Sequence, residues 1–122
     1  MPEKNILVVD DEPELLKFTG TVLRKNGYTV FEASNPSRAL EIFNREKGNI
    51  HLVMSDVLMP EQNGLQMAEE LLAANPQLKV IFSSGYVDEE SACIKKKGYR
   101  FLQKPYQITD LLKAVSGALK KI

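Results

Sequence analysis

The chain alternates between short apolar runs and amphipathic stretches, and this alternation constrains its fold more than any other feature. The apolar runs have the continuous or period-two pattern of strands, and they lie near residues 4–9, 29–33, 51–55, 79–83 and 99–103. Patterns with a period of 3.6 residues predict helices near residues 13–26, 36–47, 64–74, 88–97 and 107–120. Such alternation is typical of a parallel sheet covered by helices on both faces. We therefore predict a doubly wound α/β fold, with residues 1–122 forming a single domain.

The second predicted strand differs from the others because polar and apolar residues alternate along Thr29–Ala33. This pattern fits an edge position, whereas the more uniformly apolar runs fit strands that helices cover on both faces. A strand order of 2-1-3-4-5 satisfies this requirement and keeps every crossover right-handed. The turn residues agree, since Pro13 and Pro36 suit first helical turns, while Gly27 and Gly48 suit helix ends.

Composition excludes several classes of partner. The chain has 122 residues with 16 basic and 16 acidic side chains, so no overall basic field attracts nucleic acid or an anionic membrane. The single cysteine, Cys93, excludes an internal disulfide, and the first residues lack the apolar stretch of a signal peptide or membrane span. We expect a cytoplasmic protein that contacts neither nucleic acid nor membrane directly and recognises its partners through local surface features.

Polar residues follow four of the five predicted strands. They are Asp10 and Asp11 after the first strand, Asp56 after the third, Ser84 after the fourth and Lys104 after the fifth. Because open parallel sheets place ligand chemistry just outside the carboxyl ends of their strands, these side chains should converge on one pocket. Carboxylates about 4 Å apart repel one another by on the order of 4 kcal/mol per pair at an effective dielectric constant of 20, so a cation has to compensate.

A hard divalent cation suits this pocket, because Mg²⁺ takes carboxylates, water and a substrate phosphate as its ligands. We expect Asp11 and Asp56 to be direct ligands and Asp10 to act through a bound water. The main-chain carbonyl of Leu58 could complete the set.

Aspartate can also act as a nucleophile and form an acyl phosphate. Asp56 is the best candidate because it ends the strand predicted at the centre of the sheet. Transfer of a phosphoryl group requires mainly that its oxygens be neutralised. Mg²⁺, the Lys104 ammonium and the Ser84 hydroxyl would each neutralise one oxygen.

Each motif has a structural alternative when it is considered alone. The acidic run before Pro13 is typical of a helix N-terminus, with Asp10 or Asp11 as the cap. Ser84-Gly85 is compatible with a tight turn, and Lys104-Pro105 with a strand exit. The coincidence of four strand ends favours a shared pocket. The only histidine, His51, begins a strand at the opposite end, so we expect no phosphorelay role for it.

These residues lie in segments that resemble the receiver domain of two-component response regulators over essentially the whole chain. The segments that carry the resemblance are Ile6–Glu12, Asp56–Pro60, Asn63-Gly64, Ser83–Tyr86 and Lys104-Pro105. The resemblance implies a flavodoxin-like (βα)5 three-layer sandwich with the strand order given above.

The resemblance also assigns roles to the polar residues. It implies that Asp56 is the phosphoacceptor, that Asp10 and Asp11 are the acidic Mg²⁺ pair, and that Ser84 and Lys104 are the switch hydroxyl and the phosphate-sensing lysine.

Two further features follow from the resemblance alone. Phe101 stands where the family has a switch aromatic, frequently tyrosine, and the lost hydroxyl favours an inward, buried rotamer. A cis bond is implied for Lys104-Pro105.

By this resemblance the protein is the phosphoacceptor switch of a two-component phosphorelay. A partner sensor histidine kinase or histidine phosphotransfer domain would pass a phosphoryl group from phosphohistidine to Asp56 in an Mg²⁺-dependent reaction. The domain would assist its own phosphorylation and dephosphorylation without being an enzyme for other substrates. The change should appear on the surface of the fourth helix, fifth strand and fifth helix, where an unknown downstream protein binds a monomer or a phosphorylation-dependent dimer. The segment Phe82–Tyr86 is similar to receivers of hybrid sensor kinases.

Three other functions are alternatives to this one. A flavoprotein of the same architecture needs a phosphate-binding loop after the first strand, where the acidic Asp10–Glu12 would repel phosphate. An aspartyl phosphatase usually has a second acid two residues after its nucleophile, and here that position is Leu58. A degenerate receiver that binds partners without phosphorylation is the remaining alternative, although every reactive position is filled.

Overall fold

The computed structural model describes residues 4–46, 48–57, 59, 63–85, 94, 96–97 and 99–119. Five strands form one sheet: β1 (Asn5–Val9), β2 (Thr29–Ala33), β3 (Leu52–Asp56), β4 (Lys79–Ser84) and β5 (Arg100–Gln103). Their order is β2-β1-β3-β4-β5, and every neighbouring pair is parallel. The predicted strand order is therefore confirmed, with β2 at an edge of the sheet.

Four helices are described: α1 (Pro13–Lys25), α2 (Pro36–Arg45), α3 (Gly64–Ala74) and α5 (Ile108–Leu119). They lie within two residues of the predicted bounds. The helix predicted near residues 88–97 falls largely outside the described residues. Pro13 and Pro36 stand in the first turns of their helices, and Gly27 and Gly48 follow helices with the positive φ values of 92° and 75° that glycine tolerates.

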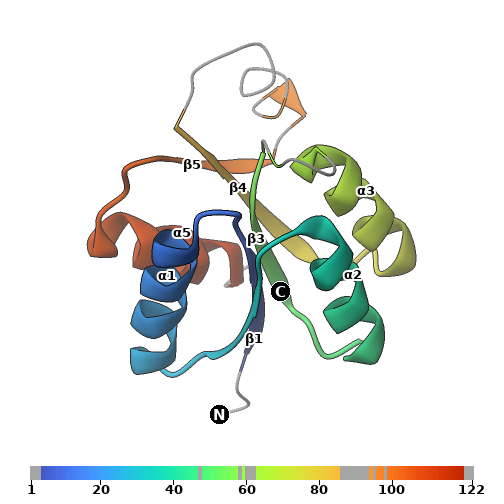
Figure 1. Cartoon of the computed structure of the whole chain (residues 1–122), viewed down its shortest axis with the longest axis horizontal. Coiled ribbons are helices and arrows are strands. Elements are labelled where there is room, and N and C mark those ends of the chain that lie inside the picture. Colours follow the sequence, from blue (N-terminus) through green and yellow to red (C-terminus); the bar gives the residue numbers. More distant parts are fainter. Residues whose placement is uncertain are drawn as a thin grey trace.

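The helices form the outer layers of a three-layer sandwich, with α1 and α5 on one face of the sheet and α2 and α3 on the other (Figure 1). Two hydrophobic clusters fill the spaces between the layers. Along β1, Leu7 and Val9 join the cluster under α2 and α3, whereas Ile6 and Val8 join the cluster under α1 and α5. A central strand that is buried on both faces must be apolar at every position, which explains the continuous apolar run in the sequence.

His51 joins three strands at the end of the sheet where β3 begins. Its main-chain N–H donates to the Asn5 carbonyl over 2.9 Å, and its carbonyl accepts from the Lys79 amide over 3.1 Å. The main-chain N–H of Asn5 also donates to the imidazole Nδ1 of His51 over 3.0 Å. Nδ1 must carry no proton to accept this bond, so the ring is neutral. Burial, and then the charge of Lys4, lower the pKa of His51 below its usual value.

We expect the contribution of His51 to the stability of the protein to fall as the pH drops from 7 towards 5. The folded state resists protonation of His51, so the unfolded state binds more protons below the ordinary histidine pKa of about 6.5. Titration of the ring protons by NMR checks this, because the chain has a single histidine. A His51→Gln variant should lose this part of the pH dependence in urea unfolding. A pKa at or above 6.5 would contradict the account.

Candidate functional site

The polar residues predicted to converge do meet at the carboxyl ends of the strands. Asp10 follows β1, Asp56 and Ser84 are the last residues of β3 and β4, and Lys104 follows β5. Parallel registers bring these ends level, since Asp56 pairs with Ser83 on the neighbouring strand. Asp10, Asp56 and Ser84 are buried, with exposed fractions of 3%, 7% and 2%. Polar side chains buried to this degree are uncommon and need specific partners.

Three carboxylates form an acidic cluster at this edge. One oxygen from each of Asp10, Asp11 and Asp56 lies within 4.8 Å of the others, and only Asp11 is exposed. Burial raises the pKa of both Asp10 and Asp56 above the usual range, although Lys104 acts in the opposite direction. Grouped carboxylate oxygens whose charge is not fully compensated are suitable ligands for a hard divalent cation such as Mg²⁺. Leu58, predicted to add its carbonyl, lies outside the described residues.

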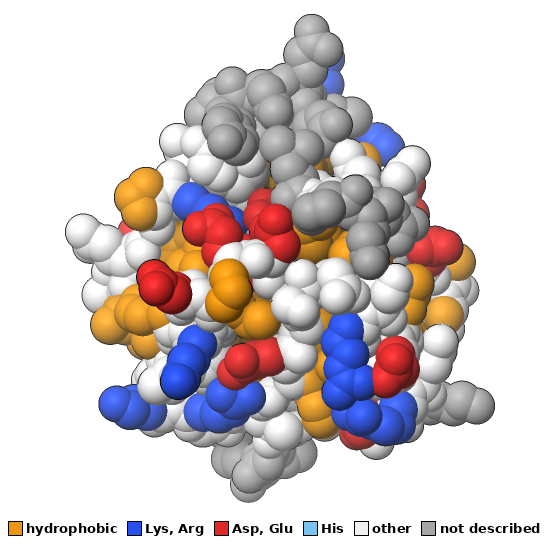
Figure 2. All heavy atoms as spheres, in the orientation of Figure 1, with side chains coloured by type: hydrophobic (Ala, Val, Ile, Leu, Met, Phe, Trp, Pro, Cys, Tyr) orange, Lys and Arg blue, Asp and Glu red, His pale blue; other side chains and the backbone are white. Residues whose placement is uncertain are grey.

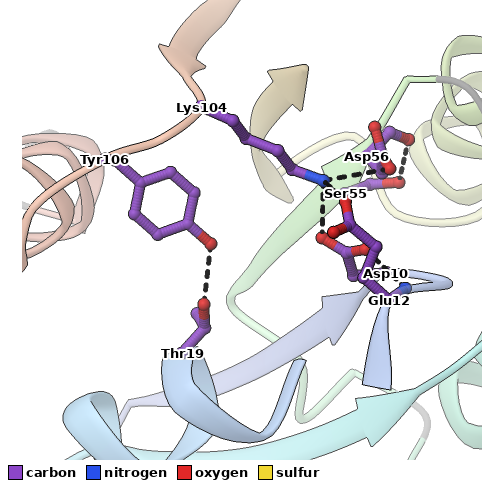
Figure 3. Close-up of polar contacts among 7 residues, drawn as sticks. All are labelled: Asp10, Glu12, Thr19, Ser55, Asp56, Lys104 and Tyr106. Atoms are coloured by element: carbon purple, nitrogen blue, oxygen red, sulfur yellow. Dashed lines mark hydrogen bonds and ion pairs between the residues drawn. The ribbon is translucent and has the colours of Figure 1, made fainter. Parts of the chain in front are cut away.

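The Lys104 ammonium lies among the carboxylates (Figure 3). Its Nζ is 3.0 Å from Asp10 Oδ2, 3.1 Å from Asp56 Oδ2 and 3.1 Å from Glu12 Oε1. Burial disfavours the ammonium, but the hydrogen bond and charge of Asp10, together with those of Asp56 and Glu12, outweigh it and raise the pKa of Lys104. The lysine is therefore a permanent cation in the pocket.

Glu12 is a contact of Lys104 that the sequence analysis did not assign. It is exposed, and its main-chain N–H donates to Asp10 Oδ1 over 2.9 Å. It is also the N-cap residue of α1. Its position directly after the acidic pair was the available signal, but the contact with Lys104 joins residues far apart in the sequence.

The start of α3 lies against the main chain of Asp56. The Ser55 hydroxyl donates to the Asp56 carbonyl over 2.9 Å, and the Gly64 amide donates to the Val57 carbonyl over 2.8 Å. A Cβ atom on Gly64 would lie only 2.1 Å from the Asp56 carbonyl oxygen. Asn63 caps the helix by accepting from the Leu65 amide over 2.7 Å. Asn63-Gly64 thus allows a helix to begin in contact with the main chain of the central aspartate.

Main-chain bonds connect the strand ends that form the pocket. The Lys104 amide donates to the Ser84 carbonyl over 2.9 Å, and the Val57 amide donates to the Ser83 carbonyl over 3.0 Å. Asp56, Ser84 and Lys104 line one open pocket together with the apolar side chains of Leu15, Phe18, Pro105 and Tyr106. Figure 2 shows acidic side chains gathered on this face with hydrophobic side chains next to them.

Phe101 lies opposite Phe82 in the pairing of β4 and β5, and it packs against the cluster under α2 and α3. It is half-buried, so it is less buried than the sequence analysis predicted. The physical reason is that β5 is an edge strand that keeps its residues partly accessible. The Lys104-Pro105 bond is cis, as the resemblance implied.

Comparison with known proteins assigns the chain to a family. Residues 6–116 match the response regulator receiver domain. The sensor kinase CckA of Brucella abortus is 36% identical over 118 residues, which cover 95% of this chain. A receiver domain structure from Clostridium thermocellum has a TM-score of 0.87 and 30% identity, covering 97% of this chain and 95% of that one. The receiver domain of the hybrid histidine kinase CckA has a TM-score of 0.81 and 32% identity, covering 94% and 98%.

The chain therefore belongs to the receiver domain family of two-component systems. It spans 12% of the Brucella kinase, and 26% of the transcriptional regulatory protein GlrR of Escherichia coli, which is 34% identical. Within the described residues, no helix is long and apolar enough to cross a membrane.

Proposed function

We propose that the protein is a phosphoacceptor switch that receives a phosphoryl group on Asp56 from the phosphohistidine of a sensor kinase or phosphotransfer partner. The observation that carries this proposal is the position of the Asp56 carboxylate, which belongs to the acidic cluster with Asp10 and Asp11 and lies 3.1 Å from the Lys104 ammonium. This arrangement offers a nucleophilic oxygen that lies close both to a fixed cation and to oxygen ligands for a second cation.

The acidic cluster is the proposed Mg²⁺ site, with Asp11 and Asp56 as direct ligands and Asp10 acting through water. Bound Mg²⁺ would neutralise one oxygen of the phosphoryl group.

The residues of the chain then account for the transfer. An Asp56 oxygen attacks phosphorus in line as the bond from phosphorus to the histidine nitrogen breaks, and the electron pair of that bond stays on the imidazole. Lys104 already contacts Asp56, so its ammonium can donate a hydrogen bond to one phosphoryl oxygen with little rearrangement. The buried Ser84 is placed to donate its hydroxyl to another. The chain thus assists its own phosphorylation and is not proposed to act on other substrates.

Movement of Ser84 and Lys104 towards the phosphoryl group is proposed to change the surface of β5, α5 and the segment between β4 and β5. The Lys104 amide is bonded to the Ser84 carbonyl, so displacement of one strand end also displaces the other. β5 is in turn tied to α5, because the Arg100 guanidinium donates to the Gly117 carbonyl over 3.2 Å. A downstream protein would recognise this altered face.

Labelling with acetyl phosphate tests the proposed function. Intact mass should show a single phosphoryl adduct on the wild type with Mg²⁺, and little or none when a chelator removes the metal. Asp56→Asn should abolish the adduct while the variant remains folded. No adduct on the folded wild type with Mg²⁺ would refute phosphoacceptance and favour a binding module that does not use phosphorylation.

The phosphodonor is proposed to dock beside the pocket, on an apolar groove between α1 and the start of α5. Among the described residues, the exposed large hydrophobic side chains are Phe18 and Ile108, with exposed fractions of 40% and 48%. Both line this groove, and Phe18 also lines the pocket that contains Asp56. A donor whose histidine enters the pocket must cover this rim, and apolar side chains at the centre of an interface supply much of its binding energy.

Ile108→Ser is expected to slow phosphoryl transfer from a phosphorylated sensor kinase by about tenfold or more, because it removes an apolar contact from the docking groove. Labelling by acetyl phosphate should stay at the wild-type rate, since Ile108 lines the groove and not the pocket. Transfer from the kinase at the wild-type rate would contradict this placement of the donor.

A further inference from the structure

A buried side-chain hydrogen bond joins α1 to the segment that carries Lys104. The Tyr106 hydroxyl lies 2.7 Å from Thr19 Oγ1, and the two residues have exposed fractions of 9% and 1%. The pair lies next to the pocket, and Figure 3 shows the two side chains pointing towards each other while Lys104 extends towards the carboxylates. None of the roles described above uses this bond.

Among the described residues, the bond is one of two side-chain connections between the segment from Lys104 to Tyr106 and the stretch from Asp10 to Thr19. The other is at the pocket, where Lys104 Nζ contacts Asp10 and Glu12. Glu12 and Thr19 lie about two helical turns apart and therefore face the same side of α1. The two contacts, one just before α1 and one within it, hold the segment from Lys104 to Tyr106 at both of its ends.

Packing also holds the Tyr106 side chain in place. Its ring belongs to the hydrophobic cluster under α1 and α5, and it lines the pocket beside Pro105. A hydroxyl bonded inside such a cluster holds its ring in one place, because a shift would leave two buried polar atoms without partners.

We propose that the Thr19–Tyr106 hydrogen bond positions Lys104 against Asp56 and thereby sets the rate at which Asp56 accepts a phosphoryl group. This inference rests on the proposed function. Tyr106 and Thr19 are positioning residues, because neither contacts the reacting atoms and both act through Lys104. Without the bond, the segment from Lys104 to Tyr106 samples more orientations, and the ammonium spends less time where a phosphoryl oxygen arrives.

The test measures the maximal rate of labelling by acetyl phosphate at saturating Mg²⁺ for wild type, Tyr106→Phe, Thr19→Val and the double variant. Each single variant removes one hydroxyl and keeps the shape of its side chain. We expect each to lower the maximal rate by about two- to tenfold, with no further loss in the double variant. Wild-type rates in both single variants, or losses that multiply in the double variant, would overturn the proposal.

Val115→Ala is the control for stability alone. Val115 is fully buried in the same hydrophobic cluster, so this change destabilises the fold while keeping the hydroxyls of Thr19 and Tyr106. Its maximal rate should equal that of the wild type. If the rates of all variants simply followed their stabilities, the bond would be structural and the proposal would fail.

A second measurement does not depend on phosphorylation. The Lys104 amide donates to the Ser84 carbonyl, and its hydrogen exchange should be faster in Tyr106→Phe than in Val115→Ala. Exchange at the Val115→Ala rate would overturn the positioning role. Failure to label the wild type would instead refute the proposed function, so the two failures are distinguishable.

Discussion

Replacement of Gly64 by alanine should lower the free energy of unfolding by about 3 kcal/mol. The new Cβ would lie 2.1 Å from the Asp56 carbonyl oxygen and 3.1 Å from the Ser55 hydroxyl oxygen. The first of these is a main-chain atom of a buried strand, so it cannot move aside as a flexible side chain can. Helix propensity alone predicts the opposite sign, because alanine is favoured over glycine inside a helix by about 1 kcal/mol. Urea unfolding therefore distinguishes close approach from propensity.

Gly117→Ala is the matched control for this change. Gly117 lies in α5, and a Cβ there would come within 3.3 Å of the Arg100 guanidinium, which is the end of a flexible side chain. We expect this variant to keep or gain stability, by up to about 1 kcal/mol. Equal effects of the two substitutions would show that the start of α3 does not press against Asp56.

Removal of the pocket cation should have the second large effect. Lys104→Met keeps the length of the side chain but leaves the buried carboxylates of Asp10 and Asp56 without their ammonium partner. Breaking a buried ion pair on one side costs about 3–5 kcal/mol, and the open pocket moderates this loss. We expect a loss of about 2–3 kcal/mol at pH 7.5 in the presence of a chelator.

The pH dependence of that loss follows from the pKa shifts. Burial already raises the pKa of Asp10 and Asp56 in the folded protein, and removing Lys104 takes away the charge that opposes this shift. The folded variant then binds protons that the unfolded chain does not, so its stability is highest below the ordinary aspartate pKa and falls as the pH rises through the raised values.

Urea unfolding at pH 5 and at pH 7.5 checks this prediction. The loss of unfolding free energy caused by Lys104→Met should be smaller at pH 5 than at pH 7.5. Lys17→Met, at an exposed position of α1, is the control and should show little change at either pH. A deficit that does not vary with pH would contradict the account of the buried carboxylates.

The sheet and the principal pocket residues could be predicted because each strand of a doubly wound fold can be recognised from the pattern of its own residues. Ile6–Val9 must be apolar at every position when helices cover both faces, and the residue after such a run must lie at the carboxyl edge. Asp10, Asp56 and Lys104 were therefore found from the position of each strand end.

The supporting contacts could not be predicted because they depend on distances between segments far apart in the chain. Thr19 and Tyr106 are separated by 87 residues, and neither belongs to a sequence motif that indicates their contact. The Gly64 requirement arises from close approach of a helix to a carbonyl, which depends on the packing angle and not on the pattern. Phe101 was predicted to be more buried than it is, because its exposure depends on what covers an edge strand.

The central claim is that the phosphoryl group is carried by Asp56 itself. The direct measurement is to label the wild type with acetyl phosphate and Mg²⁺, reduce the product with borohydride, and locate the modified residue by peptide mass spectrometry. Borohydride converts an aspartyl phosphate to homoserine and leaves an unmodified aspartate unchanged. The account predicts homoserine at position 56 only when both phosphodonor and Mg²⁺ are present. Homoserine at position 10 or 11, or a stable phosphate ester elsewhere, would contradict it.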